Sequence, residues 1–381
     1  MNGEHSIQRI QTFVLNMPVT QTAGEIADEQ RIYPMPGRTS AQSAQVTSLV
    51  VRLETASGIV GWGEITGPDS AINSLVIDEY LAPLVVGTDP FSISVLWERM
   101  RGQTNGRHLG AIGAVDMALW DIAGQIAGVP ACKLMGGQIR DRIPVIAADV
   151  PYATGDTRAT EQIKSLTSLG YRTVKIRVNT PIKNASDMFR PLQSAVSETG
   201  AVVISTVGAD DFALARQIGN QAQAINAAWF ESPLSAGNLR DASRLAEYLD
   251  IPVAGGSNLQ GRWQFNVALA ASAFDIVHVN VGFAGGISEA LRIITLADTY
   301  GLPFVTVNVP GTTISRAATL QVAAAGANLM GCEWPLSSTP EDSILRERFT
   351  VADGYVSIKD SPGLGVRIDE AELKKWYAES A

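Results

Sequence analysis

Cysteine is scarce in this sequence. Cys132 and Cys332 are the two thiols in 381 residues, and neither has a partner in a CxxC spacing. A disulfide framework and a cysteine-based zinc site are therefore both disfavoured, and we expect two buried, reduced thiols.

Positive charge is scarce as well. Lys and Arg number 29 against 38 Asp and Glu, which leaves a net charge of −9. This balance argues against a broad surface for nucleic acid or for an anionic membrane. Neither a basic, apolar leader at the N-terminus nor a long, uncharged apolar stretch is evident. We expect a soluble, cytoplasmic protein that binds no nucleic acid and no membrane.

The first part of the chain has the pattern of a small α+β domain, which we place at residues 1–140. Alternating apolar residues predict three strands of an antiparallel sheet: Arg9–Leu15, Thr47–Glu54 and Ile59–Glu64. A long polar connection, residues 18–45, joins the first two strands, is typical of a binding lid and contains Tyr33 as a candidate substrate contact. Helical periodicity then predicts three helices: Ala71–Leu84, Ser92–Arg101 and Gly110–Ala127.

From residue 141 to residue 334, short β-branched runs alternate with helical segments. Eight such runs are present: Pro144–Ala148, Thr173–Val178, Val202–Thr206, Ala227–Glu231, Pro252–Gly255, Ile276–Asn280, Phe304–Asn308 and Leu329–Glu333. Eight strand–helix pairs predict a (β/α)8 barrel, with functional side chains near the carboxyl ends of the strands. An open doubly wound sheet has the same alternation, but the dinucleotide fingerprint that often accompanies it is absent. Residues 335–381 hold a return strand and a terminal helix, which we expect to lie against the first domain.

Several motifs resemble those of one family. Residues 114–124, followed by Leu134–Gly137, resemble the helix that joins cap and barrel in the mandelate racemase/muconate lactonizing group of the enolase superfamily. Further segments match in the same order: Gly61–Glu64, Trp229–Pro233, Ile251–Gly256, Gly285–Ile287 and Pro362–Gly365. The resemblance covers nearly the whole chain and implies a modified (β/α)8 barrel with an N-terminal α+β capping domain.

The resemblance implies removal of a proton next to a carboxylate, with Mg²⁺ and hydrogen-bond donors stabilising the enediolate. Family members take one metal ligand from each of strands three, four and five. The corresponding positions here are Ser205, Glu231 and Ser257, so only Glu231 keeps a family ligand. Because neutral hydroxyls offset the dehydration of Mg²⁺ poorly, we expect no cofactor and no tight Mg²⁺ site.

The acid and base positions of the family are altered too. Asn280 and Asn308 stand where members often have an Asp or Lys and a His, and an amide exchanges no proton near neutral pH. We treat both as substrate-binding candidates. Lys175 and Arg177 resemble the cationic pair of strand two, and Glu333 resembles the strand-eight acid that binds the substrate carboxylate. We expect these three to be catalytic, with Arg177 binding the carboxylate and Lys175 the better base.

Other interpretations stay open. The cations and carboxylates of the barrel mouth can also form a structural ion-pair network left from an ancestral site. Asp210 and Asp211 are expected to cap the next helix, and His108 and His278 to have structural roles.

Three functions remain. The first is a lyase or isomerase that acts on a small hydroxy- or amino-carboxylate, of the acid-sugar kind, without the usual Mg²⁺ site. The second is a non-catalytic relative that binds a carboxylate. The third is a magnesium enzyme whose ligands have moved to Asp210, Asp211 or Asn258. In each case we expect a small carboxylate partner and a homo-oligomer.

Overall fold

The structure, a computed structural model, describes residues 3–18, 45–152, 158–178, 189–192, 200–206, 211–308, 313–336 and 343–380. The expected lid, apart from its two end residues, lies outside the described residues. Its candidate contact Tyr33 and the candidate cap Asp210 lie outside them as well.

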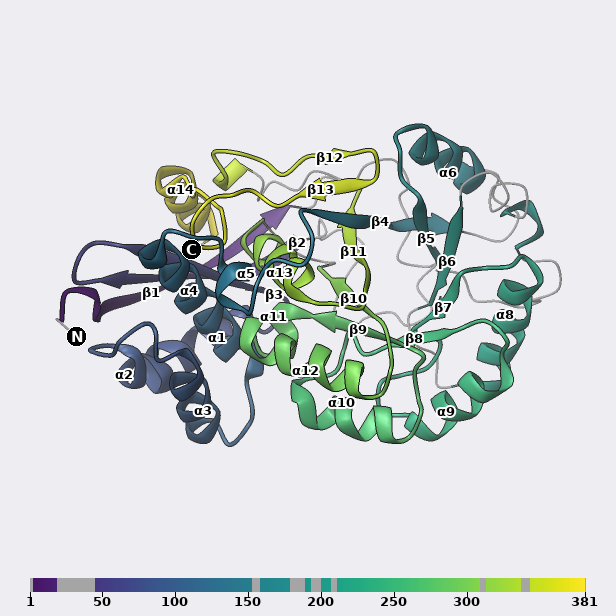
Figure 1. The fold of residues 1–381 in the computed structure, drawn as a ribbon, viewed down its shortest axis with the longest axis horizontal. Coiled ribbons are helices and arrows are strands. Elements are labelled where there is room, and N and C mark those ends of the chain that lie inside the picture. Colours follow the sequence, from purple (N-terminus) through teal and green to yellow (C-terminus); the bar gives the residue numbers. More distant parts are fainter. Residues whose placement is uncertain are drawn as a thin grey trace.

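A three-stranded antiparallel sheet forms the first part of the chain (Figure 1). After a 3-10 turn, η1 (Gly3–His5), the strands in spatial order are β1 (Ile7–Pro18), β2 (Gln45–Thr55) and β3 (Val60–Thr66). Leu49, Val51 and Leu53 alternate along β2 and are fully buried in the core of this domain. The helices that follow are α1 (Ser70–Val76), α2 (Ala82–Val85), α3 (Ile93–Gln103) and α4 (Leu109–Ala127). The predicted elements are confirmed, but a π-helical turn, η3 (Ile77–Leu81), divides the first predicted helix.

Eight strands in the described part of the chain form one parallel barrel. They neighbour one another in chain order, and the last pairs with the first, with Glu333 beside Ile146. The strands are β4 (Arg142–Tyr152), β5 (Thr173–Val178), β6 (Ala201–Ser205), β7 (Trp229–Glu231), β8 (Val253–Gly255), β9 (Ile276–Asn280), β10 (Phe304–Val307) and β11 (Leu329–Pro335). This closure confirms the predicted (β/α)8 barrel and excludes the open sheet.

Helices surround the barrel on its outer side (Figure 1). They are α6 (Arg158–Ser168), a 3-10 turn η4 (Arg190–Leu192), α8 (Phe212–Ala224), α9 (Leu239–Tyr248), α10 (Gly261–Ala270), α11 (Val281–Ala284), α12 (Ile287–Thr299) and α13 (Thr313–Ala325). A short helix, α5 (Ala131–Leu134), precedes the first barrel strand.

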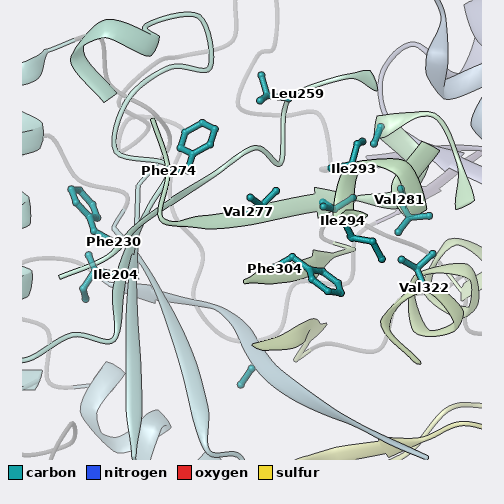
Figure 2. Close-up of a cluster of buried hydrophobic side chains, with 14 of the residues drawn as sticks. Ile204, Phe230, Leu259, Phe274, Val277, Val281, Ile293, Ile294, Phe304 and Val322 are labelled. Carbon is teal, nitrogen blue, oxygen red and sulfur yellow. The ribbon is translucent and has the colours of Figure 1, made fainter. Parts of the chain in front are cut away.

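Alternate side chains of the barrel strands enter two different apolar layers. Val203, Trp229 and Ile276 belong to a small buried cluster inside the barrel. Their neighbours along the strands, such as Phe230 and Val277, belong to the large cluster between strands and helices, part of which Figure 2 shows. Because successive side chains of a strand point to opposite faces, the residue two positions after each inner residue also faces inward, nearer the carboxyl end. This alternation explains why polar side chains from several strands gather at the barrel mouth.

The C-terminal segment returns to both parts of the molecule. Strands β12 (Val351–Ala352) and β13 (Tyr355–Ser357) extend the barrel sheet beside β4, and α14 (Glu370–Ser380) packs on β1. The rings of Phe13 and Tyr377 meet edge to face at 5.4 Å. Cys132 and Cys332 are buried free thiols, as expected.

Helix α4 lies between the first domain and the barrel. A Cβ added at Gly63 would lie 1.8 Å from the carbonyl oxygen of Ala114, so β3 packs directly on α4. Among the described helices, α4 alone has the length and the mean hydropathy (1.2) of a membrane span, which corrects our expectation that no stretch would qualify. However, 83% of this stretch is buried inside the protein, as in the core helix of a globular fold.

Two carboxylates of α4 hold the neighbouring segments together. Asp116 accepts hydrogen bonds from the backbone N and Oγ of Ser288 at 2.9 and 2.5 Å, at the start of α12. Asp121 accepts from the backbone N–H groups of Trp62 and Leu364 at 3.0 and 2.8 Å. Burial raises the pKa of Asp116 to about 7 and that of Asp121 to about 6. Cap, barrel and C-terminal segment therefore meet on one helix.

Replacing Asp116 with Asn should flatten the dependence of stability on pH. Because the folded pKa of about 7 exceeds the ordinary 3.8, the folded protein keeps a proton between these values that the unfolded chain has released. The proton on Asp116 therefore adds to the free energy of unfolding. This addition is fully present below pH 3.8 and is lost as pH rises through about 7. The slope is on the order of 1 kcal/mol per pH unit. Urea unfolding of parent and Asp116→Asn between pH 4 and 8 measures the difference, and parallel curves would contradict the assignment.

Candidate active site

A cavity of about 670 Å³ opens at the carboxyl ends of the barrel strands. Its wall on the cap side comes from Ile65, Thr66 and Pro68, at and just after the end of β3. On the barrel side it is lined by eight residues that the sequence analysis named as functional candidates: Lys175, Arg177, Ser205, Glu231, Ser257, Asn258, Asn280 and Glu333. Residues from distant parts of the sequence therefore converge on one site, as the strand pattern predicted.

Lys175 lies at the centre of a buried ion cluster. Its Nζ donates to Glu333 Oε1 at 2.5 Å and to Glu231 Oε1 at 3.2 Å. The side chains of Lys175, Glu231 and Glu333 are 2%, 7% and 1% exposed, so water screens these contacts little. Two carboxylates beside an ammonium favour its charged form. This arrangement does not favour the neutral amine that we expected for a base at Lys175.

His278, for which the sequence analysis expected a structural role, lies beside this ion cluster. It follows the inner residue Ile276 by two positions, which aims its ring into the barrel, and its Nδ1 lies 3.8 Å from Glu231 Oε2. Neither ring nitrogen has a hydrogen-bond partner among the described residues. Burial lowers the pKa of His278 to about 4; the charge of Glu231 opposes this shift and that of Lys175 adds to it. The imidazole is therefore neutral at pH 7.

The polar layer of the mouth also has the composition of a cation site. One atom each of Glu231, His278 and Glu333 can act as ligand, and these three atoms lie within 4.8 Å of one another. The three residues come from β7, β9 and β11, alternate strands of the barrel. The sequence held a signal for this position of His278, because a side chain two positions after an inward-facing residue of a strand also faces inward.

Arg177 lies two residues beyond Lys175 on β5 and therefore on the same inward face, one layer nearer the mouth. Its side chain is half-buried, whereas that of Lys175 is buried. The guanidinium is planar and keeps its charge at any physiological pH, which suits it to a carboxylate that enters the cavity.

The two asparagines are placed differently from each other. Asn280 lines the cavity and also caps α11, since its Oδ1 accepts from the backbone N of Phe283 at 3.2 Å. Asn308 is buried and its Oδ1 accepts from Ser315 Oγ at 2.8 Å. Ser315, rather than Asn308, is the one of this pair that lines the cavity.

Asp211 is the expected helix cap. Its carboxylate accepts from the backbone N–H groups of Ala213 and Leu214 at 2.9 and 3.1 Å, at the start of α8. This confirms the capping prediction for Asp211.

Glu64 anchors the cap wall of the cavity to the barrel. This fully buried carboxylate of β3 accepts from the backbone N–H groups of Ile314 and Ser315 at 3.1 and 3.0 Å, in the first turn of α13. It also accepts a hydrogen bond from Ser48 Oγ on β2. A carboxylate at a helix N-terminus satisfies amides that have no partner within the helix. The residues that follow Glu64 are thereby held at the mouth.

Comparison with known proteins agrees with this architecture. Residues 22–136 match the family model described as the mandelate racemase/muconate lactonizing enzyme N-terminal domain, and residues 158–372 match the model described as enolase C-terminal domain-like. A D-galactonate dehydratase of Xanthomonas oryzae pv. oryzae is 30% identical over 86% of this chain and 90% of its own length. A D-galactarolactone cycloisomerase of Agrobacterium fabrum is 29% identical over 86% and 90%. The crystal structure of a racemase from Streptomyces coelicolor A3(2) with bound magnesium has the same fold, with a TM-score of 0.81, 22% identity and coverage of 97% and 99%.

The imidazole of His278 should stay neutral down to about pH 5. Since its folded pKa of about 4 lies below the ordinary 6.5, the unfolded chain binds a proton in this window that the folded protein does not. The corresponding stability is present above pH 6.5 and is lost as pH falls toward 4. An NMR titration of the ring signals measures the midpoint, and a His278→Gln variant identifies the signal by its loss. A midpoint at or above 6.5 would contradict the buried, neutral state.

Proposed function

Because the chain belongs to the mandelate racemase/muconate lactonizing enzyme family of the enolase superfamily, we propose that it binds a small hydroxy- or amino-carboxylate at the barrel mouth. We propose further that it converts this ligand by a lyase or isomerase reaction without the usual Mg²⁺ site. The single observation that carries the proposal is the cavity that Lys175 and Arg177 line together with Glu231 and Glu333.

The size and the lining of the cavity support an acid-sugar type of ligand. Neutral hydroxyl groups contribute much of the polar wall: Ser205, Thr206, Ser232, Ser257 and Ser315. Hydroxyls donate and accept, so they pair well with the hydroxyls of a polyol chain. The related dehydratase and cycloisomerase carry names of sugar-acid chemistry, which points in the same direction.

Arg177 is the group best suited to bind the ligand carboxylate. It lines the cavity one layer above the Lys175 cluster, and its donors are arranged to meet a carboxylate in a two-pronged way. A carboxylate bound there would place its neighbouring carbon toward the buried cluster. Arg177 is thus assigned to orientation and to stabilisation of the developing enediolate.

We assign Lys175 a different role from the base that the sequence favoured. Held by two carboxylates, it supplies a fixed positive charge toward the enediolate. The groups of the lining that can accept a proton are Glu231 and Glu333. In a dehydration, one carboxylate would take the proton next to the substrate carboxylate and then give this same proton to the leaving hydroxyl, whose C–O bond breaks as the enediolate collapses to the enol. Water then leaves, and the charges of the site are restored.

The residues at the family's magnesium positions do not fit that ion. Ser205 and Ser257 offer neutral hydroxyls, and the Nζ of Lys175 lies 3.2 Å from Glu231 Oε1. A hard divalent cation at this position would have to give up part of its water shell. In return it would gain one carboxylate, and that carboxylate already contacts a positive charge. No step of the proposed reaction therefore passes through a metal.

Two alternatives follow from the same cavity. A non-catalytic relative would use Arg177 in the same way to bind a carboxylate, and turnover of a sugar acid distinguishes the two. A magnesium enzyme with relocated ligands is less favoured, because the Asp211 carboxylate caps α8 and Asn258, which lines the cavity, contributes no charge.

The isolated protein should contain no stoichiometric divalent metal at Ser205, Glu231 and Ser257. Elemental analysis of the purified protein tests the content, and a chelator should leave the melting temperature unchanged. A single tightly held Mg²⁺ at these residues would overturn this part of the proposal. As the matched gain-of-function control, Ser205→Asp combined with Ser257→Glu should create measurable binding at millimolar Mg²⁺.

Arg177→Ala should weaken the binding of a true ligand by about ten- to a hundred-fold, because a buried charge-assisted contact contributes roughly 1.5–3 kcal/mol. Arg177→Lys should recover part of the loss, since Lys keeps the charge but not the fork. Calorimetric titration with a panel of sugar acids measures the affinities. The matched control is Arg172→Ala, which removes an exposed arginine just before the other end of β5. Equal affinities of the parent and Arg177→Ala for a confirmed ligand would show that Arg177 is no anchor.

A further inference from the structure

The buried cluster around Lys175 has the form of a cation site whose cation is part of the chain. We propose that the Lys175 ammonium occupies a cation site built by Glu231, His278 and Glu333, and that removal of this ammonium converts the cluster into a site for a divalent metal of the zinc class. The inference rests on the proposed metal-independent function and deepens it, because it says what replaces the metal.

The first support is the position of the ammonium. Lys175 Nζ contacts Oε1 of Glu333 and Oε1 of Glu231, which come from β11 and β7. Each side chain is less than a tenth exposed. Two buried carboxylates that share one ammonium need a cation between them, since isolated buried charges are very costly.

The second, independent support is the imidazole of His278. Its side chain is 1% exposed, and Nδ1 lies 3.8 Å from Glu231 Oε2, the oxygen opposite to the one that Lys175 contacts. Both ring nitrogens are buried and form no hydrogen bond with any described residue. Buried polar groups usually have a hydrogen-bond partner, so a buried imidazole without one needs an explanation. Beside two carboxylates, its nitrogen is placed to act as a ligand of a cation.

The ligand set predicts which metal the vacated cluster would bind. Ligand atoms of Glu231, His278 and Glu333 lie within 4.8 Å of one another. Tetrahedral Zn²⁺ with bonds of about 2.1 Å needs separations of about 3.4 Å, so the side chains would have to close by roughly an ångström. Loss of the ammonium removes the contact that Lys175 Nζ makes with each glutamate. One imidazole and two carboxylates suit Zn²⁺ or Co²⁺ better than Mg²⁺, which prefers an all-oxygen shell.

This site differs from the family's magnesium position in the strands that build it. It uses β7, β9 and β11 and requires neither Ser205 on β6 nor Ser257 after β8. Glu231 is the member common to both sets. The same fold would thus support a cation at an offset position, nearer the centre of the barrel mouth.

Replacement of Lys175 tests the proposal directly. Lys175→Met removes the charge at similar length, and Lys175→Arg keeps the charge as the matched control. We expect Lys175→Met to bind one Zn²⁺ or Co²⁺ per chain, at least about a hundredfold more tightly than the parent or Lys175→Arg, because a resident positive charge repels a divalent ion. Calorimetry and equilibrium dialysis measure affinity and stoichiometry. The visible spectrum of Co²⁺ reports nitrogen and oxygen ligation.

Second substitutions in the Lys175→Met background identify the ligands. His278→Ala should abolish the tight binding, whereas His108→Ala, at the start of α4, should leave it unchanged. If Lys175→Met does not fold without metal, Lys175→Ala serves instead, because Lys175 lines the cavity and water can then reach the glutamates. For either variant, Zn²⁺ should raise the melting temperature. The same variant combined with His278→Ala should show no such rise, and this difference supports the site.

The outcomes separate this inference from the proposed function. If no variant that lacks the Lys175 charge binds Zn²⁺ or Co²⁺ more tightly than Lys175→Arg, the inference is wrong and the metal-independent function stands. Binding that survives His278→Ala likewise overturns it, since the ion then lies elsewhere. If the parent itself holds a stoichiometric metal through Glu231, His278 and Glu333, both the inference and the metal-independent function fail.

Discussion

The barrel mouth depends on the ammonium of Lys175 between two buried carboxylates. Strands β7 and β11 bring Glu231 and Glu333 into the interior, where neither charge can be hydrated as in water. Removal of the ammonium would take the Lys175 contact from both buried carboxylates at once, so the positions and the protonation of the three groups are linked. The half-buried Arg177 above them, and the neutral His278 beside them, have their environment set by this cluster.

A second constraint holds the cap at the mouth. Carboxylates buried between the two parts of the molecule, Glu64 and Asp116, accept backbone N–H groups at the starts of α13 and α12. The absence of a side chain at Gly61 and Gly63 lets β3 approach the backbone of α4 closely. Because the cap wall of the cavity begins directly after Glu64, the same hydrogen bonds that join the domains also shape the site.

Local pattern was sufficient for most elements. The β-branched runs became strands within a few residues of their predicted ends, and Asp211 caps its helix as expected. The exceptions share a physical cause. The helix predicted over residues 71–84 contains a π-helical turn, and α4 has the composition of a membrane span yet is covered by protein. Neither property depends on the segment alone, because each is decided by what packs against it.

The sequence by itself determined the barrel, the cap and the convergence of the strand-end residues, because period-two alternation and strand–helix spacing are local properties. It also identified Lys175, Arg177, Glu231 and Glu333 as one group, since their positions at strand ends require proximity. Only the tertiary structure decided the state of that group. The distances that make Lys175 the shared partner of two glutamates, the burial that keeps His278 neutral, and the placement of Asn308 behind Ser315 arise from strands far apart in the chain. Electrostatic energies depend on such distances and on the exclusion of water, and neither can be read from sequence spacing.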